Sequence, residues 1–242
     1  MAARKTKKKV SKRPSPKARG AAALKRTAKS RTPRASAKRD AKATRRRPPA
    51  KAGSKQHHPH AVSNLALELD GLAHVRGLIR DIPNFPQPGV LFRDITPLLA
   101  DPRAFHIVLD ALAERFVGEH IDAVVGIESR GFIFGGALAA RLNASFVPVR
   151  KPGKLPYRTE KVSYSLEYGE SELEMHRDSL REGARVLIVD DLLATGGTAA
   201  AAAELVDRQG GVVAAFAFVI ELDALGGRNR LDSAPIISIL NY

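Results

Sequence analysis

Short apolar runs alternate with helix-like segments over most of the second half of the chain, and this alternation constrains the fold more than any other feature. The apolar runs are rich in β-branched residues, and the segments between them carry small or amphipathic residues at helical spacing. The expected strands are residues 123–127, 145–149, 185–190, 212–222 and 235–240, and the expected helices are residues 131–142 and 198–208. This pattern predicts an α/β fold with a mainly parallel twisted sheet flanked by helices on both faces.

Two further helices are expected upstream of these strands. Apolar residues between positions 65 and 79 have amphipathic helical spacing, and the Asp-Ile-Pro at 81–83 is expected to end that helix. Asp101 followed by Pro102 is typical of a capped helix start, and the apolar residues that follow fall on one helical face. Residues 84–94 hold two prolines and a glycine among large apolar residues, which predicts an ordered connection.

Residues 1–60 differ in composition from the rest of the chain. They hold 22 Lys and Arg against a single acid, Asp40, whereas residues 61–242 hold 18 bases and 24 acids. Val10 and Leu24 are the only large aliphatics of residues 1–60, and no aromatic residue is present, so burial cannot offset the entropy of ordering. We expect a disordered Lys/Arg-rich tail followed by one domain over residues 61–242.

The tail has the composition of a solvated polycation. Such a segment can contact nucleic acid or another polyanion by releasing counterions, and without aromatic side chains it cannot stack on bases to read a sequence. A charged extension with no dedicated partner is the alternative. Both interpretations stay open at the level of the sequence.

The absence of certain residues and segments excludes several classes of protein. The chain has no cysteine, which excludes disulfide scaffolds, thiolate zinc sites and cysteine nucleophiles. Its apolar stretches are far shorter than the ~20 residues of a membrane span. We therefore expect a soluble, cytoplasmic protein with no membrane contact, and the acid-poor N-terminal segment leaves organelle targeting open.

One segment carries a specific chemistry. From Val186 to Thr198 the sequence reads VLIVDDLLATGGT, a buried-type strand that ends in two acids and a small-residue turn before a helix. The glycines let successive N–H groups point at one anion, and the helix start adds its positive dipole end. Thr195 and Thr198 add hydroxyl donors, so a phosphate monoester fits. Asp190 and Asp191 can accept hydrogen bonds from sugar hydroxyls or hold a hydrated Mg²⁺.

This segment resembles the phosphoribosyl-diphosphate (PRPP) binding motif of the type I phosphoribosyltransferases. It is not a P-loop, because no Gly-Lys-Ser/Thr follows, and two acids before the glycines exclude a dinucleotide fingerprint. Three more segments, and RKPGKLP at 150–156, are similar to the adenine phosphoribosyltransferases and follow their order: FPQPGVLFRDITP at 85–97, GIESRGF at 126–132 and YSLEYG at 164–169. The resemblance covers about residues 66–242, not the tail, and implies the type I phosphoribosyltransferase fold with a small hood.

The resemblance implies two sets of PRPP contacts. The residues implied to hold the 5′-phosphate and ribose are Asp190, Asp191, Ala194, Thr195, Gly196, Gly197 and Thr198. The residues implied to hold the diphosphate are Glu128, Ser129, Arg130, Arg150, Lys151 and Lys154. The local chemistry agrees, because both diphosphate segments follow expected strand ends and carry N–H groups or cations that can take up negative charge. The family also implies a cis or strained Glu128–Ser129 peptide.

The base-binding residues are implied in the same way. The main-chain groups of Leu91 and Arg93 read the edge of adenine, the ring of Phe92 packs against it, and Leu192 also lines the base site. The residues by themselves leave another interpretation open, in which Leu91 and Phe92 belong to the core.

Residues 164–169 have no clear buried face, so by themselves they are compatible with an exposed strand or a hairpin arm. The resemblance implies that they form the mobile catalytic loop. Glu167 would then handle the purine proton, and Tyr168 would help to shield the reaction from water. Together with Arg130, these are the implied catalytic residues.

The implied reaction is adenine plus PRPP giving AMP plus diphosphate, a step of purine salvage. The implied cofactor is Mg²⁺, held through PRPP and water near Asp190 and Asp191 with no assigned protein ligand, and the implied assembly is a homodimer. Two alternatives stay open. One is a phosphoribosyltransferase for xanthine or another 6-oxopurine, and the other is a regulator that senses PRPP while its basic tail binds nucleic acid.

Overall fold

The computed structural model describes residues 60–166 and 169–242, and the expected tail lies outside them. The helices are α1 (His60–Gly77), α2 (Thr96–Ala100), α3 (Pro102–Glu114), α4 (Gly131–Leu142) and α5 (Gly197–Arg208), with two 3-10 turns, η1 (Asp223–Leu225) and η2 (Gly227–Arg230). The strands are β1 (Arg80–Pro83), β2 (Leu91–Asp94), β3 (Ala123–Ile127), β4 (Ser145–Val149), β5 (Thr159–Leu166), β6 (Gly169–His176), β7 (Arg185–Leu193), β8 (Val212–Glu221) and β9 (Ile236–Asn241).

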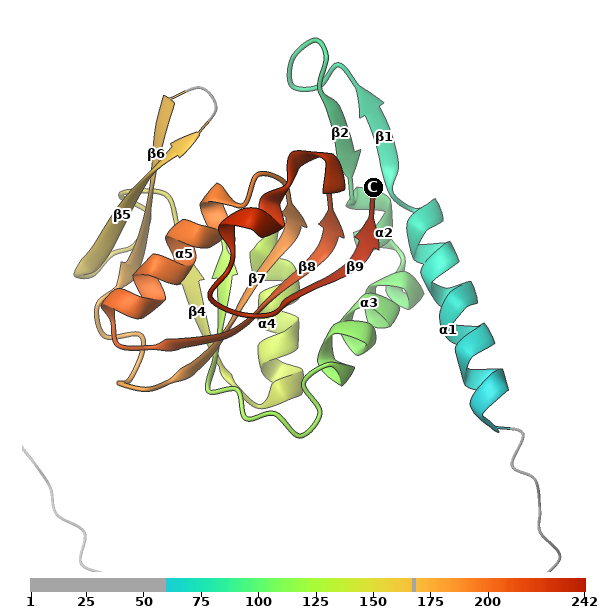
Figure 1. Cartoon of the computed structure of the whole chain (residues 1–242), viewed down its shortest axis with the longest axis horizontal. Coiled ribbons are helices and arrows are strands. Elements are labelled where there is room, and N and C mark those ends of the chain that lie inside the picture. The colour runs from blue at the N-terminus through green and yellow to red at the C-terminus, as the bar shows by residue number, and fades with distance from the viewer. Residues whose placement is uncertain (1–59, 167–168) are drawn as a thin grey trace, which may run out of the picture. The chain divides into compact units, whose positions relative to one another are not determined.

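Five strands form one sheet in the order β4-β3-β7-β8-β9, and every neighbouring pair is parallel (Figure 1). After β3 the chain adds β4 on one side, whereas β8 and β9 follow β7 on the other side. The strand order therefore reverses between β3 and β7, and open α/β sheets bind ligands outside the carboxyl ends of the strands at such a point. The structure confirms the expected α/β fold and places the candidate site at the ends of β3 and β7.

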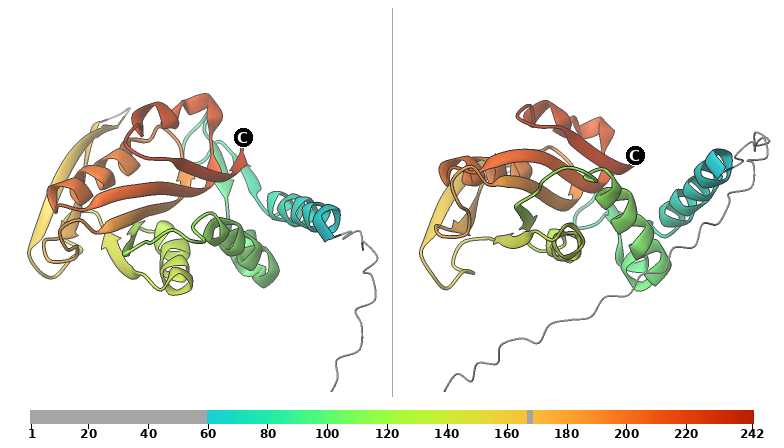
Figure 2. Two further views of the ribbon diagram at one scale, coloured as in Figure 1. Left: turned by 60° about the horizontal axis from the view of Figure 1, so that its bottom comes forward. Right: turned by 90° about the horizontal axis from the view of Figure 1, so that it is seen from below.

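The two faces of the sheet have separate cores. In β7, Leu187 and Val189 join the apolar cluster formed with α1–α4, whereas Val186 and Ile188 join the cluster formed with α5 and the β5–β6 hairpin. Figure 2 shows α3 and α4 on one side of the sheet and α5 on the other. Because successive side chains of a strand point to opposite faces, both faces of β7 are covered, and its near-continuous apolar sequence follows from that burial.

A separate two-stranded antiparallel sheet, β1 with β2, stands beside the carboxyl ends of the main sheet (Figure 1). The helix expected up to residue 79 is α1, and it ends earlier than predicted, at Gly77. Residues 80–83, which were predicted to end that helix, form strand β1 instead. The last four residues of the expected 84–94 connection form β2. These strands depend on pairing between segments about ten residues apart, which local spacing does not reveal.

Other boundaries agree with the sequence or shift slightly. The Asp101 side chain accepts a hydrogen bond from the N–H of Ala104 at 2.9 Å, so the predicted cap of α3 is confirmed. Strand β7 continues past the predicted end at residue 190 to Leu193, because its last residues pair with the end of β8. The two acids therefore lie within the strand. Helix α5 begins one residue earlier than predicted, at Gly197.

Candidate active site

The glycine-threonine loop after β7 has the sharply turned backbone that its glycines predict. Gly196 adopts a positive φ of 78°, a conformation that L side chains rarely take. A Cβ at Gly196 would also lie 2.5 Å from the carbonyl oxygen of Gly227. The loop leads directly into Gly197, the first residue of α5, so its N–H groups stand at a helix start. The N–H groups of this segment are therefore available to an anion, and a side chain at position 196 would not fit.

The opposing glycine was missed by the sequence analysis. A Cβ at Gly227 would collide with the carbonyl oxygen of Ala194, so η2 packs directly on the loop. The next residue, Arg228, fixes η2 with two hydrogen bonds of 2.6 and 2.7 Å to the carboxylate of Glu221 at the end of β8. Burial alone would raise the pKa of Glu221, but hydrogen bonds from Arg228 and Ser238 lower it below its ordinary value. The Gly226-Gly227 pair is the sequence signal that could have found this contact.

The two acids of β7 are held close together beside the start of α4. The Asp190 carboxylate accepts a hydrogen bond from the N–H of Asp191 at 2.9 Å, and Asp191 is only 3% exposed. Arg130 Nε lies 3.1 Å from Asp191 Oδ2 in an ion pair. Gly131 has no room for a side chain, because a Cβ there would lie 2.9 Å from Asp190 Oδ1. The start of α4 and the acid pair are therefore in direct contact.

Burial and mutual repulsion disfavour ionisation of this pair. Burial, followed by the charge of Asp191, raises the pKa of Asp190 well above its ordinary value. Burial also raises the pKa of Asp191, although Arg130 opposes the shift. A site that holds two unfavourable negative charges close together is suited to a ligand with hydroxyl donors or positive charge.

This repulsion gives a prediction for stability. A raised pKa in the folded state means that the folded protein loses stability as the pH rises from the ordinary Asp value through the raised value. Asp190→Asn removes one of the charges, so we expect it to raise the Tm of the ligand-free protein by about 2–6 °C at pH 7. The gap between variant and wild type should widen from pH 5 to pH 8 in thermal scans.

A matched control for this experiment is Asp178→Asn, an exposed acid in the loop before β7. It should leave the Tm within about 1 °C of wild type at either pH, because exposed substitutions away from packed features have small effects. An Asp190→Asn protein that is no more stable than wild type at pH 8 would show that the acid pair is not under electrostatic strain.

A second cluster lies after β3 and β4. The Glu128–Ser129 peptide is cis, as the resemblance implied. The Glu128 carboxylate accepts hydrogen bonds from Arg150 Nε at 3.0 Å and from the N–H of Lys151 at 3.1 Å. Burial alone would raise the pKa of Glu128, but the contacts with Arg150 and Lys151 lower it below its ordinary value. Glu128 and Arg150 thus bind each other and hold the basic loop next to the end of β3.

A buried acid that the sequence analysis did not single out supports the other side of this basic loop. Glu174 in β6 is 2% exposed. Its carboxylate accepts hydrogen bonds from the N–H groups of Lys154 and Leu155, at 3.0 and 3.1 Å, and from the Thr159 hydroxyl at 3.2 Å. Two carboxylates, Glu128 directly after β3 and Glu174 in β6, therefore fix the loop that carries the three predicted cations.

The β1–β2 sheet is connected to the acid pair through Arg130. The Cζ atom of Arg130 lies 5.2 Å from the centre of the Phe92 ring, and the same guanidinium pairs with Asp191. Leu91 is 46% exposed and Phe92 is half-buried, so neither is a core residue. Main-chain groups of alternate strand residues point the same way, so Leu91 and Arg93 present theirs on one side of β2.

The remaining predicted residues are distributed around this centre. Leu192 is partly buried and packs against the apolar cluster formed with α1–α4. The Thr198 hydroxyl donates to the Tyr164 hydroxyl at 3.3 Å, so β5 contacts the glycine-threonine loop. Strand β5 ends at Leu166 and β6 begins at Gly169, which agrees with the hairpin-arm interpretation of this segment. Glu167 and Tyr168 lie outside the described residues.

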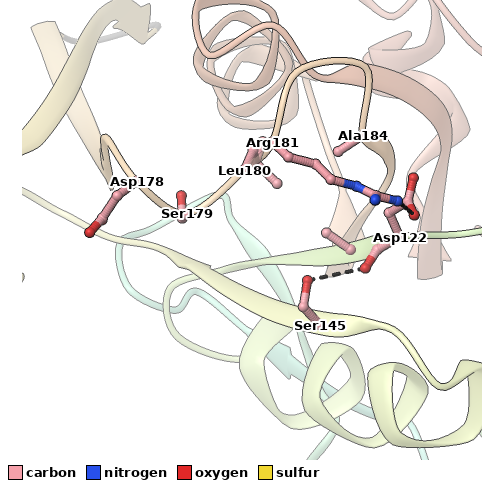
Figure 3. Close-up of a pocket in the computed structure, with 8 residues that line it drawn as sticks. Asp122, Ser145, Asp178, Ser179, Leu180, Arg181 and Ala184 are labelled. Atoms are coloured by element: carbon pink, nitrogen blue, oxygen red, sulfur yellow. Dashed lines mark hydrogen bonds and ion pairs between the residues drawn. The ribbon is translucent and has the colours of Figure 1, made fainter.

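A hollow of about 310 Å³ lies at the other ends of the strands (Figure 3). It is lined by the start of β3, the start of β4 and the loop before β7. The carboxylate of Asp122 there already accepts hydrogen bonds from the N–H of Arg185, from His120 at 2.9 Å and from Arg181. These bonds, first the one from Arg185, lower the pKa of Asp122. At this hollow the Asp122 carboxylate connects neighbouring chain segments, and the hollow lies away from the carboxyl ends of β3 and β7.

Comparison with known proteins identifies the family. The chain matches the phosphoribosyl transferase domain family over residues 95–237. The adenine phosphoribosyltransferase of Sorangium cellulosum is 69% identical over 176 residues, which cover 71% of this chain and 88% of the relative. The chain belongs to the adenine phosphoribosyltransferase family. It is therefore a pentosyltransferase of purine salvage, as the sequence resemblance implied.

Solved adenine phosphoribosyltransferases share the fold described above. The structure from Rhodothermus marinus has 51% sequence identity and a TM-score of 0.70, and the match covers 72% of this chain and 99% of that one. The Saccharomyces cerevisiae enzyme, complexed with an imino-altritol bisphosphate and adenine, has 42% identity and a TM-score of 0.67, with 71% and 99% covered. The predicted phosphoribosyltransferase fold is thus confirmed for the part of the chain that these structures match.

Two kinds of feature are absent from the described part of the chain, a membrane-spanning helix and a metal-binding cluster. No helix over residues 60–166 and 169–242 has the length and apolar character needed to cross a bilayer. Across the same residues, no group of three or more His, Asp and Glu side chains could hold a metal ion by itself.

Proposed function

We propose that this protein transfers the phosphoribosyl group of PRPP to N9 of adenine, giving AMP and diphosphate. One observation carries the assignment to these residues. Arg130 contacts both Phe92 of the β1–β2 sheet and Asp191 of β7, so a flat base and a charged sugar phosphate could bind on either side of it. The reversal of strand order lies at the same place.

The PRPP side of the site follows from charge. The 5′-phosphate binds the loop from Ala194 to Thr198, where main-chain N–H groups at a helix start and the hydroxyls of Thr195 and Thr198 can donate to it. The ribose hydroxyls donate to Asp190 and Asp191. The raised pKa values of these acids mean that their charged forms are poorly stabilised in the ligand-free site, so hydrogen-bond donors from a ligand are favoured there. The diphosphate binds the N–H groups of Glu128 and Ser129 together with the nearby cations, which are Arg130, Arg150, Lys151 and Lys154.

The base binds under the β1–β2 sheet, which corresponds to the hood of the family. Main-chain groups of Leu91 and Arg93 read the edge of adenine, while Phe92 and Leu192 contact its ring. By resemblance to the family, Glu167 manages the proton that N9 loses, and Tyr168 helps to exclude water. In the transition state the sugar becomes cation-like, and Arg130 with the basic loop stabilises the negative charge that gathers on the departing diphosphate.

The cofactor we propose is Mg²⁺. The donor set fits a hydrated ion, because Asp190 and Asp191 offer hard carboxylate oxygens. Asp191 Oδ2 is buried, and although Arg130 Nε lies 3.1 Å from it, it accepts no hydrogen bond within the described residues. Two carboxylates are too few to hold the ion alone, so PRPP and water would complete its coordination. When bound, the ion would supply positive charge to the diphosphate. The residues of this chain orient the sugar and exclude water.

A base-specificity assay tests the proposal. Purified full-length protein with PRPP and Mg²⁺ should convert adenine far faster than hypoxanthine, guanine or xanthine, as followed by product chromatography. Faster turnover of an oxopurine would favour the 6-oxopurine alternative. PRPP binding without turnover of any base would favour the regulator alternative, and no PRPP binding at all would overturn the assignment.

A second proposed function concerns residues 1–60. We propose that this segment binds nucleic acid phosphates without sequence preference and is separate from the phosphoribosyltransferase domain of residues 61–242. Its 22 basic residues against one acid favour a polyanion. Only two large aliphatic residues are present, which leaves no amphipathic stripe to insert into a membrane.

The nucleic acid proposal is tested with the full chain and a variant lacking residues 1–60. We expect the full chain to retard random-sequence duplex DNA at 50 mM salt and to lose at least about tenfold in affinity by 200 mM salt. The truncated chain should not bind DNA, while its turnover of adenine should remain near that of the full chain. Equal DNA binding by both proteins, or binding only to anionic vesicles, would contradict the proposal.

We also propose a homodimer in the cytoplasm. Support for the dimer comes from family resemblance and from apolar side chains on α4 and the edge strand β4, where Ile133 is 42% exposed and Phe146 is 38% exposed. Light scattering at micromolar concentration distinguishes a dimer from a monomer. A monomer that is fully active would contradict the assembly.

A further inference from the structure

We infer that Tyr242 is a positioning residue for adenine, acting through its contact with Arg93 of the hood. This inference rests on the proposed function, because it takes the main chain of Arg93 as part of the base site. The Cζ atom of Arg93 lies 4.0 Å from the centre of the Tyr242 ring, and the Cζ atom of Arg76 lies 4.6 Å from it. Both distances are within the range of cation–π attraction.

The hood needs an anchor of this kind. Strands β1 and β2 form a sheet of their own and share no ladder with the five-stranded sheet. An isolated two-stranded sheet is marginally stable in water, so side-chain contacts must fix its position. Two ion pairs, Arg80 with Asp94 and Arg93 with Asp81, run between β1 and β2 but do not connect them to the main sheet.

Tyr242 is firmly fixed on the main sheet. It directly follows β9, its N–H donates to the carbonyl of Glu221 at 2.9 Å, and its own carbonyl accepts from the N–H of Asp223 at 2.9 Å. These bonds involve the main chain only, so a change of side chain leaves the anchor point in place. Figure 1 shows the end of β9 next to β1 and α1.

The same residue also receives α1. Arg76 in the last turn of α1 donates to the carbonyl of Asn241 at 3.1 Å and contacts the Tyr242 ring. The ring is therefore the point where the last strand of the main sheet, the first described helix and the hood meet. Because the Arg93 side chain is 16% exposed, its guanidinium is largely enclosed between Asp81 and this ring.

The contact bears on adenine because Arg93 is fixed at both ends. Its main chain belongs to β2, next to Phe92, and its guanidinium is held on the main sheet by Tyr242. Holding the side chain limits rotation of β2 about its own axis, which sets the direction of the main-chain groups that would read the base. Loss of the aromatic face should therefore weaken adenine binding more than PRPP binding.

The structure offers a matched pair of substitutions. The Tyr242 hydroxyl is buried and has no hydrogen-bond partner among the described residues, so Tyr242→Phe keeps the ring and removes a group that contributes no bond. Tyr242→Leu keeps an apolar side chain, although a smaller one, and removes the aromatic face. A difference between the two variants therefore reports loss of the aromatic ring, and Arg93→Met, which removes the cation and keeps the ring, separates the cation–π contact from packing.

The test measures KM for each substrate and hydrogen exchange of residues 80–94 in the ligand-free protein. We expect Tyr242→Leu to raise KM for adenine by about three- to tenfold, with KM for PRPP within about twofold and faster exchange in the hood. Tyr242→Phe should match wild type in all three. If Tyr242→Leu does not fold, Arg93→Met, which removes the cation, should give the same selective rise.

Three results would overturn the inference. They are an unchanged KM for adenine in Tyr242→Leu, equal rises in both KM values, or a Tyr242→Phe protein that behaves like Tyr242→Leu. A wild-type protein that does not use adenine would instead overturn the proposed function. In that case the exchange measurement still decides whether Tyr242 anchors the hood.

Discussion

Gly196→Ala is expected to reduce kcat/KM for PRPP by about 100-fold or more, because displacing a bound group by about 1 Å is enough for a loss of that size. Two effects act together at this position. The backbone has a φ of 78°, which strains any L side chain, and the new Cβ would lie 2.5 Å from the carbonyl oxygen of Gly227. The loop and η2 must separate, which would move the N–H groups away from the position of the proposed 5′-phosphate site.

The measurement is steady-state kinetics with PRPP varied at saturating adenine, alongside thermal unfolding. The control is Gly136→Ala in α4, where a Cβ would meet nothing within 4 Å. That variant should keep full activity and gain about 0.5–1 kcal/mol of stability, because alanine is the better helix former. Normal PRPP kinetics in a folded Gly196→Ala protein would remove the loop from the phosphate site.

Glu167→Ala is expected to lower kcat for AMP formation by about 10²- to 10⁴-fold while PRPP still binds with nearly wild-type affinity. The reason is that a general acid or base contributes about this factor to the chemical step and little to ground-state binding. Single-turnover kinetics measures the first effect, and calorimetric titration with PRPP measures the second.

Glu170→Ala is the matched control for Glu167→Ala, since Glu170 is an exposed acid in the same hairpin, on β6 opposite Ser165. It should leave both measurements near wild type. If Glu167→Ala turns over as fast as Glu170→Ala, Glu167 has no part in the proton transfer, and another group must receive the proton from N9.

The sequence alone was sufficient for the central strands and for the identity of the candidate loops. Residues 123–127, 131–142 and 145–149 were predicted with the same bounds that the structure has. They are short, apolar and bounded by clear breaks, so local composition determines them. The VLIVDDLLATGGT segment was equally informative, because its glycines and acids have local consequences for the backbone and for charge.

The sequence did not reveal the features that depend on contacts between distant segments. Strands β1 and β2 were predicted as a helix stop and a connection, since their pairing is visible only once both segments are placed. Glu174 and Gly227 were missed for the same reason. Their functions lie in what they touch, a loop some twenty residues earlier in one case and the carbonyl of Ala194 in the other.

By itself, the sequence determined the fold class, the family and the residue types available to bind a phosphate, a diphosphate and a purine. Only the tertiary structure decided how those residues meet. It brought Arg130 between Phe92 and Asp191, packed η2 against the glycine-threonine loop and placed the ring of Tyr242 against Arg93. The physical reason is that local propensity acts over only a few residues. A site built from distant chain segments forms only when burial of a common apolar core brings those segments together.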